Sequence, residues 1–184
     1  DAYGTLFDVN SVARNCSGEL GNADFIGKWP VVSAQWREKQ LSYSWLVSMM
    51  NSYRSFWNIT KDALDYALEF ANIDSDEQLK SRLLKSYLEI DAYPEVLETL
   101  KNLKKEGIMT AILSNGSLDM LKPAVQSAKI DLWLDAVLSV EEVQVFKPDG
   151  RVYEMVTNHF KIKKSEVLFI SSNGWDIAGA GKYG

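Results

Sequence analysis

Apolar residues recur at helical spacing through the first half of the chain. Positions three and four apart form three stripes, which are Trp36, Gln40, Tyr43, Val47 and Met50; then Ala63, Leu64, Ala67, Leu68 and Ala71; then Leu79, Leu83, Leu84, Tyr87 and Leu88. A capping-box pattern at residues 75–78 predicts where the third helix begins. We therefore predict that residues 11–92 are helical and that their stripes bury against one another as a small helical bundle.

The pattern changes at about residue 93. Pro94 is expected to open a helix that ends near Gly107, and residues 109–113 then form a continuous apolar run, as buried parallel strands do. Short apolar runs at 137–138 and 167–170 repeat that signature, with helical patterns between them. This alternation predicts an α/β fold with a doubly wound parallel sheet of Rossmann-like type.

The two patterns divide the chain into two regions. Residues 1–10 and 93–184 are expected to form the Rossmann-like α/β core, and residues 11–92 a helical-bundle cap inserted into it. Polar residues follow the predicted strands, at 114–115 after the first and at 171–173 after the last. Because open parallel sheets bind ligands beyond the carboxyl ends of their strands, we expect the functional site there.

Composition and charge exclude several classes of protein. The net charge is −5 and no long basic run occurs, so no nucleic-acid partner is expected. No apolar run approaches the roughly 20 residues of a membrane span, so no membrane partner is expected. The single cysteine, Cys16, excludes an internal disulfide and fits a reducing compartment, which indicates the cytoplasm. The single histidine, His159, is expected on the surface and leaves little material for a histidine-based triad or a zinc site.

Four segments carry recognisable motifs in a fixed order. They are residues 1–8 (DAYGTLFD), 113–117 (LSNGS), 146–153 (FKPDGRVY) and 171–176 (SSNGWD). Together they resemble the motifs of the L-2-haloacid dehalogenases, in the haloacid-dehalogenase-like superfamily, over nearly the whole chain. The resemblance implies hydrolytic dehalogenation of short-chain L-2-haloacids to D-2-hydroxy acids through an aspartyl-ester intermediate, without a cofactor.

The resemblance also implies roles for individual residues. Asp1 matches the nucleophile, and carboxylates do act as covalent nucleophiles. The expected catalytic residues are Asp1, Thr5, Arg37, Ser114, Lys147, Tyr153, Ser171, Asn173 and Asp176. The expected halide contacts are Arg37, Asn115 and Trp175, and the expected substrate contacts are Tyr3, Leu41, Phe56, Ser114, Asn115, Lys147 and Trp175.

Two departures from the phosphatases of the superfamily predict a site without a metal ion. Phosphatases carry a second aspartate two residues after the nucleophile, which protonates the leaving alcohol, and Tyr3 stands at that position here. They also place acidic magnesium ligands in the last motif, where this chain has residues 171–173 (SSN) and a single acid, Asp176. A departing halide needs neither proton nor magnesium, whereas a weakly hydrated guanidinium such as that of Arg37 suits it.

Two other functions stay open on the sequence alone. One is a magnesium-dependent phosphatase of the same superfamily, against which Tyr3 argues. The other is a non-catalytic relative that binds through its helical bundle, against which the retained set of candidate catalytic residues argues. Glu38 stands where the family often has glutamine, and its additional negative charge bears on the range of substrates.

The resemblance further implies a homodimer and a chain that is a fragment. The nucleophile of a doubly wound sheet ends a central strand, so an apolar strand of roughly 5 or 6 residues is expected before Asp1. A further strand is expected after Gly184. We therefore expect residues 1–184, expressed alone, to aggregate or to show no dehalogenation.

Overall fold

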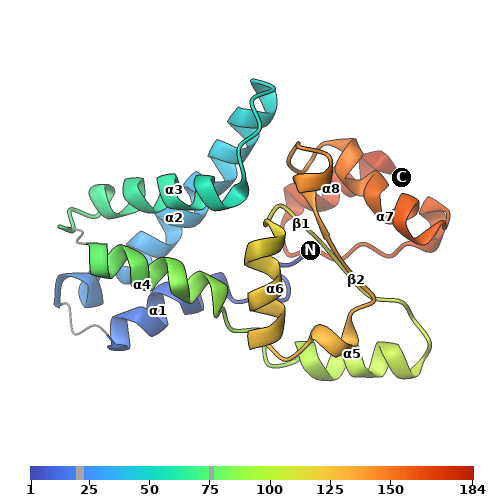
Figure 1. The fold of residues 1–184 in the computed structure, drawn as a ribbon, viewed down its shortest axis with the longest axis horizontal. Coiled ribbons are helices and arrows are strands. Elements are labelled where there is room, and N and C mark those ends of the chain that lie inside the picture. Colours follow the sequence, from blue (N-terminus) through green and yellow to red (C-terminus); the bar gives the residue numbers. More distant parts are fainter. Residues whose placement is uncertain (20–22, 75–76) are drawn as a thin grey trace.

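The computed structural model describes residues 1–19, 23–74 and 77–184, which form two groups of elements (Figure 1). The first group contains α1 (Val9–Glu19), α2 (Ala23–Met49), α3 (Phe56–Phe70) and α4 (Glu77–Leu88). The second contains α5 (Val96–Lys105), β1 (Ala111–Ser114), α6 (Leu118–Ser127), β2 (Ala136–Ser139), α7 (Gly150–Phe160) and α8 (Gly174–Tyr183), with 3-10 turns η1 (Asp131–Trp133), η2 (Val140–Glu142) and η3 (Lys164–Glu166). None of the helices in these ranges combines the length and the apolar composition needed to cross a bilayer.

The first four helices pack on one another and bury the predicted stripes. α2 lies along both α1 and α3, and α1 also contacts α4. Every member of the stripe at residues 63–71 is buried, as its helical spacing predicts. The stripe on α2 stops one position earlier than predicted, because the helix ends at Met49 and leaves Met50 exposed. The predicted capping box begins at residues 75–76, which lie outside the described ranges.

The described sheet consists of β1 and β2, which pair in parallel. Their register runs from Ala111 opposite Ala136 to Ser114 opposite Ser139, so both strands end at the same edge. α6 lies between these strands and the first four helices, and α7 and α8 lie on the far side (Figure 1). Helices on both sides of parallel strands are the layered arrangement that the alternating pattern predicts.

Residues 167–170, predicted as a strand, carry no ladder within the described chain. The carbonyl of Ile170 accepts a hydrogen bond of 3.1 Å from the backbone nitrogen of Asp1. Leu168 and Ile170 are 85% and 60% exposed. A strand is assigned only where a neighbouring backbone pairs along its length, and an apolar run does not specify that neighbour.

The two segments that connect the helical group to the strands run side by side. Phe7 and Ala92 form an antiparallel bridge, and the backbone nitrogen of Tyr93 donates to the carbonyl of Leu6 at 2.9 Å. The chain thus leaves the strand-bearing group and returns to it at one place. The division into a core of residues 1–10 and 93–184 and a cap of residues 11–92 is kept below as a proposal.

Candidate active site

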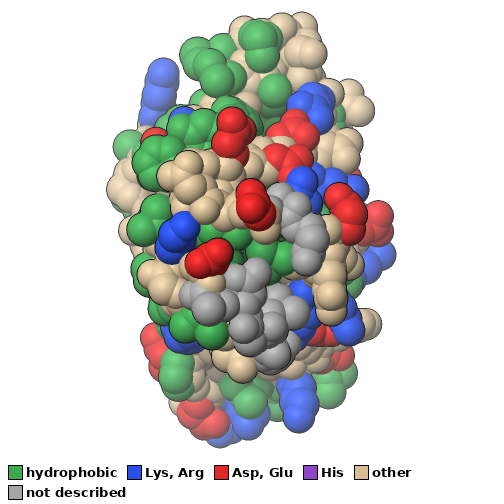
Figure 2. Space-filling view, turned by 90° about the vertical axis from the view of Figure 1, so that its left-hand side faces the viewer, with side chains coloured by type: hydrophobic (Ala, Val, Ile, Leu, Met, Phe, Trp, Pro, Cys, Tyr) green, Lys and Arg blue, Asp and Glu red, His purple; other side chains and the backbone are tan. Residues whose placement is uncertain are grey.

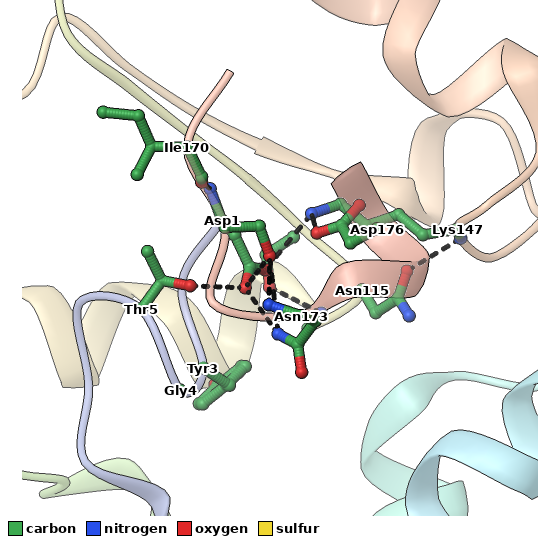
Figure 3. Close-up of polar contacts among 12 residues, drawn as sticks. Asp1, Tyr3, Gly4, Thr5, Asn115, Lys147, Ile170, Asn173 and Asp176 are labelled. Atoms are coloured by element: carbon green, nitrogen blue, oxygen red, sulfur yellow. Dashed lines mark hydrogen bonds and ion pairs between the residues drawn. The ribbon is translucent and has the colours of Figure 1, made fainter. Parts of the chain in front are cut away.

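The Asp1 carboxylate lies at the centre of a cluster of donors (Figure 3). Its Oδ2 accepts hydrogen bonds from Thr5 Oγ1 at 2.8 Å, from Ser171 Oγ at 3.1 Å and from Asn173 Nδ2 at 3.1 Å. Its Oδ1 accepts one, from Lys147 Nζ at 3.2 Å. The loop after Asp1 and the loop before α8 supply the three neutral donors, and the loop before α7 supplies the cation.

The two oxygens of Asp1 therefore have different chemistry. Three donors occupy the lone pairs of Oδ2 and hold the carboxylate in one orientation. Oδ1 keeps lone-pair capacity beyond its contact with Lys147. An ionised carboxylate held in this way can attack an electrophilic carbon through Oδ1.

Lys147 is a buried cation between two carboxylates. Its side chain is 1% exposed, and its Nζ lies 3.2 Å from Asp1 Oδ1 and 2.8 Å from Asp176 Oδ2. Burial lowers the pKa of Lys147 to about 8, and the neighbouring Asp176 partly opposes that shift. The Lys147 backbone nitrogen also donates to Asn115 Oδ1 at 3.0 Å, which ties the lysine loop to the end of β1.

Asp176 is fully buried near the first turn of α8, and both of its oxygens are occupied. Oδ2 receives the Lys147 ammonium, and Oδ1 receives the hydroxyl of Tyr153 at 2.7 Å. Burial raises the pKa of Tyr153 far above its ordinary value, so this hydroxyl stays protonated and donates. Tyr153 on α7 thus orients Asp176, which in turn orients Lys147.

The loop after β1 is held by hydrogen bonds of its own. Ser114 Oγ accepts from the Gly116 backbone nitrogen at 3.0 Å, and Ser139 Oγ at the end of β2 donates to the Gly116 carbonyl at 2.8 Å. A Cβ at position 116 would lie 2.8 Å from the Tyr3 ring, so glycine is required for this close approach. The observed contact of Ser114 shapes the loop, and its role in binding a substrate carboxylate stays a prediction.

Arg37 projects from α2 towards the nucleophile loop. Its Nη2 donates to the backbone carbonyl of Tyr3 at 3.2 Å. No carboxylate in the described ranges lies within ion-pair distance of this half-buried guanidinium, so its charge is available to a bound anion. Glu38, the next residue, is exposed and accepts from Gln35 Nε2 at 3.4 Å, which places its charge on the surface.

Aromatic side chains surround the predicted substrate contacts. Phe56 is buried, with its ring 6.4 Å from Tyr3 and 5.8 Å from Phe146, so it serves as core as well as wall. Trp175 meets Trp45 of α2 edge to face at 5.5 Å, and Leu41 on the same helix is half-buried. The Tyr3 hydroxyl and the Trp45 indole nitrogen are buried without a hydrogen-bond partner among the described residues. Buried polar groups are normally paired, so these two atoms are exceptions to the usual pattern beside the site.

Sequence patterns did not single out three side chains that lie close to this cluster. Gln40 and Tyr87 were assigned only to helical stripes, and they form a buried hydrogen bond of 3.0 Å with each other. Trp45 was not assigned to the site. The sequence did contain a signal for the pair of Gln40 and Tyr87, because helical spacing predicts that Gln40 is buried. A buried amide needs hydrogen-bond partners, so polar neighbours could have been expected.

Comparison with known proteins extends over the whole chain. Residues 1–184 match the family described as haloacid dehalogenase-like hydrolase. The chain is 42% identical to (S)-2-haloacid dehalogenase 4A of Burkholderia cepacia and 44% identical to (S)-2-haloacid dehalogenase 1 of Pseudomonas sp. (strain CBS-3), in each case over 184 residues. These alignments cover all of this chain and 78% and 79% of the relatives.

Solved structures give the same result. The structure of L-2-haloacid dehalogenase from Xanthobacter autotrophicus with chloropropionic acid covalently bound is similar with a TM-score of 0.89 and 39% identity, covering 100% of this chain and 72% of that one. A crystal structure of a dehalogenase is similar with a TM-score of 0.94 and 41% identity, covering 100% of this chain and 79% of that one. Their α/β fold with a parallel sheet and a helical cap is the fold class that the sequence predicts.

Proposed function

Because the chain belongs to the haloacid dehalogenase-like hydrolases, we propose that it hydrolyses short-chain L-2-haloacids to D-2-hydroxy acids. Relatives at about 40% identity bear the name (S)-2-haloacid dehalogenase, and one similar structure holds chloropropionic acid covalently bound. The geometry that carries the proposal is the Asp1 carboxylate, fixed through Oδ2 and open at Oδ1. Arg37 lies nearby and has no carboxylate partner among the described residues.

In the first step Asp1 displaces the halide. Oδ1 attacks C2 of the substrate from the side opposite the halogen; the Oδ1–C2 bond forms while the carbon–halogen bond breaks, and the halide leaves with the bonding pair. The configuration at C2 inverts. Lys147 keeps Asp1 ionised before attack, and Arg37, Asn115 and Trp175 receive the halide.

In the second step water hydrolyses the ester. Water attacks Cγ of Asp1, and negative charge develops on Oδ2, where Thr5, Ser171 and Asn173 already donate. Preorganised donors of this kind are worth roughly 10²–10³ in rate each. We assign the activation of the water to Asp176. The tetrahedral adduct collapses with cleavage of the Cγ–Oδ1 bond, and Oδ1 leaves as the new hydroxyl oxygen with the proton that Asp176 took from the water. The second water proton passes to solvent, which returns Asp1 to its carboxylate form.

The proposed reaction is metal-independent. The Lys147 ammonium lies between the Asp1 and Asp176 carboxylates, at 3.2 and 2.8 Å, and supplies the positive charge that this pair of anions requires. The phosphatase alternative is not favoured, because Tyr3 stands where a phosphatase needs an acid and its ring is buried against Phe56 and Tyr87.

We also propose a cytoplasmic homodimer. Acidic and basic side chains are interspersed on the face shown in Figure 2. That face lacks the single-sign electrostatic field that would attract a polyanion, so we propose no nucleic-acid partner. Exposed apolar side chains collect near the carboxyl end of α2, where Leu46, Met49 and Met50 are 47%, 75% and 65% exposed. A second copy of the chain would cover them.

Chloride release from the two enantiomers of 2-chloropropionate, with and without EDTA, tests the function. We expect release from the L enantiomer, none from the D enantiomer, and no loss in EDTA. Complete inhibition by EDTA that magnesium reverses would exclude the metal-independent mechanism. Absence of release from the L enantiomer by the full-length, folded enzyme would exclude the function itself.

A single turnover in ¹⁸O-labelled water, with enzyme in excess, tests the ester intermediate. Because water attacks Cγ rather than C2, the first hydroxy acid formed should carry no label, and the label should enter Asp1. Labelled hydroxy acid in the first turnover would show direct hydrolysis at C2.

A further inference from the structure

We propose that a buried chain of neutral side chains, Tyr87, Gln40 and Thr60, positions Arg37 for halide binding without neutralising its charge. This inference rests on the proposed function. The three residues come from α4, α2 and α3, and all are almost completely buried. None of them touches Asp1, so they act through Arg37 and are positioning residues.

The direction of each hydrogen bond in this chain follows from the last one. Thr60 Oγ1 donates to the Phe56 carbonyl at 2.8 Å, which uses its only proton. Thr60 must therefore accept from Gln40, whose Nε2 lies 2.9 Å away. The amide of Gln40 then turns its Oε1 towards Tyr87, whose hydroxyl donates to it at 3.0 Å.

The consequence falls on Arg37. The Tyr87 proton is committed to Gln40, so only lone pairs of its oxygen remain for another partner. Burial raises the pKa of Tyr87, and Arg37 lies close enough to lower it. The guanidinium donates to the Tyr3 carbonyl, 3.2 Å from Nη2, and the Tyr87 ring packs 5.4 Å from the Tyr3 ring, so the free lone pairs of Tyr87 lie beside Arg37.

Neutral acceptors have a specific advantage here. A carboxylate would also hold the guanidinium, but its negative charge would compete with a departing halide for the same cation. A phenol oxygen and a peptide carbonyl fix the orientation of Arg37 and leave its full charge for the halide. The Tyr87 ring also packs 5.4 Å from Tyr3 and 5.2 Å from Trp36, so the acceptor itself is immobile.

The test compares Tyr87→Phe with Tyr66→Phe in the full chain. Tyr66 lies on α3 outside this hydrogen-bond chain, and its ring is covered by Lys39 at 4.3 Å. Chloride released in a single turnover reports the first step, formation of hydroxy acid reports the second, and chloride as a product inhibitor reports the halide site. For Tyr87→Phe we expect a slower first step and an unchanged second step. The chloride inhibition constant should rise about 10-fold or more, because a hydrogen bond to a charged group is lost.

Thr60→Val tests whether the hydrogen-bond chain positions Arg37 by changing the end of the chain that is farther from Arg37. Valine matches the shape of threonine but neither accepts from Gln40 nor donates to Phe56, so the amide loses its fixed orientation. We expect Thr60→Val to weaken chloride inhibition in the same direction, and Thr60→Ser to restore it. This pair also serves if Tyr87→Phe does not fold, which circular dichroism would show.

The outcomes separate the inference from the function on which it rests. If the full-length, folded wild-type enzyme releases no chloride from L-2-chloropropionate, the proposed function fails. If the wild type is active and both Tyr87→Phe and Thr60→Val keep its first-step rate and its chloride inhibition constant, only the inference fails. Equal slowing of both steps, with normal chloride inhibition, would also overturn it, because it would indicate a general structural role.

Discussion

At the scale of single residues, the unequal environment of the two Asp1 oxygens separates the two chemical steps. Attack on C2 uses Oδ1, which has one donor, whereas ester hydrolysis develops charge on Oδ2, which has three. A substitution that removes a donor to Oδ2 should therefore slow hydrolysis more than halide displacement.

Thr5→Val is expected to make the ester accumulate. It removes the shortest of the three contacts to Oδ2 and keeps the shape of the side chain. Turnover should fall roughly 10²-fold, while chloride release in the first turnover remains fast. Intact-protein mass spectrometry of the quenched reaction should find the alkylated chain. Thr157→Val is the control, because Thr157 lies on α7 and its hydroxyl bonds to Glu154 and Tyr183 rather than to Asp1. Accumulation of ester in both variants, or in neither, would contradict the assignment.

Lys147 is expected to make stability rise with pH above about 8. Its pKa is lowered to about 8 in the folded protein from the ordinary 10.5, so between these values the unfolded chain binds more protons. The burial penalty of the ammonium is then relieved as pH increases. Urea unfolding gives the free energy of unfolding of the wild type and of Lys147→Met at pH 7 and pH 10. From pH 7 to pH 10, the wild type should gain roughly 1–3 kcal/mol of stability relative to the variant. Parallel pH profiles would show that Lys147 has an ordinary pKa.

Sequence reasoning found most of the polar cluster but not what supports it. Asp1, Lys147 and Asp176 lie in separate segments that the family resemblance assigns to one site, and their side chains do meet. Gln40 and Tyr87 were hidden, because helical spacing marks a position as buried without saying which buried groups hydrogen-bond. The partners of the Gln40 amide come from two other helices, α3 and α4, so they are known only once the packing of the three helices is known.

At the scale of elements, hydrophobic spacing together with proline and glycine positions predicts where helices begin and end, but does not predict which strands pair. The helix expected between Pro94 and Gly107 is α5, and Gly107 adopts a φ of +72°, the left-handed conformation that suits a helix end. Residues 167–170 show the limit. Their apolar run predicts a strand, yet pairing depends on a neighbouring backbone that is distant in sequence.

Two glycines of α8 form a matched pair. A Cβ on Gly179 would lie 2.4 Å from the Tyr153 hydroxyl and 2.6 Å from Pro148 Cβ, whereas a Cβ on Gly181 meets nothing within 4 Å. Gly179→Ala should therefore cost roughly 1–3 kcal/mol of stability and lower activity, because it moves Tyr153 away from Asp176. Gly181→Ala should stabilise by up to about 1 kcal/mol. Urea unfolding and chloride release measure both, and equal effects would show that α8 does not pack closely at Gly179.

At the scale of the whole molecule, the exposed end of α2 is the surface expected to respond to a change of charge. Met49→Glu with Met50→Glu places two carboxylates where a second copy is proposed to pack, so the variant should sediment as a monomer and the wild type as a dimer. Lys105→Glu, at the distant end of α5, lowers the net charge by the same two units and is the control. A dimer that persists in the double variant would move the interface elsewhere.

The bridge between Phe7 and Ala92 also has a consequence for how such molecules diversify. Both crossings between the helices and the strands meet there, so the helices resemble a long loop whose ends are already closed. Doubling the length of a closed loop costs only about 0.6 kcal/mol. Helices of another length can therefore be accommodated between these two residues, provided that they keep the contacts of Arg37, Phe56 and Tyr87 with Tyr3 of the Asp1 loop.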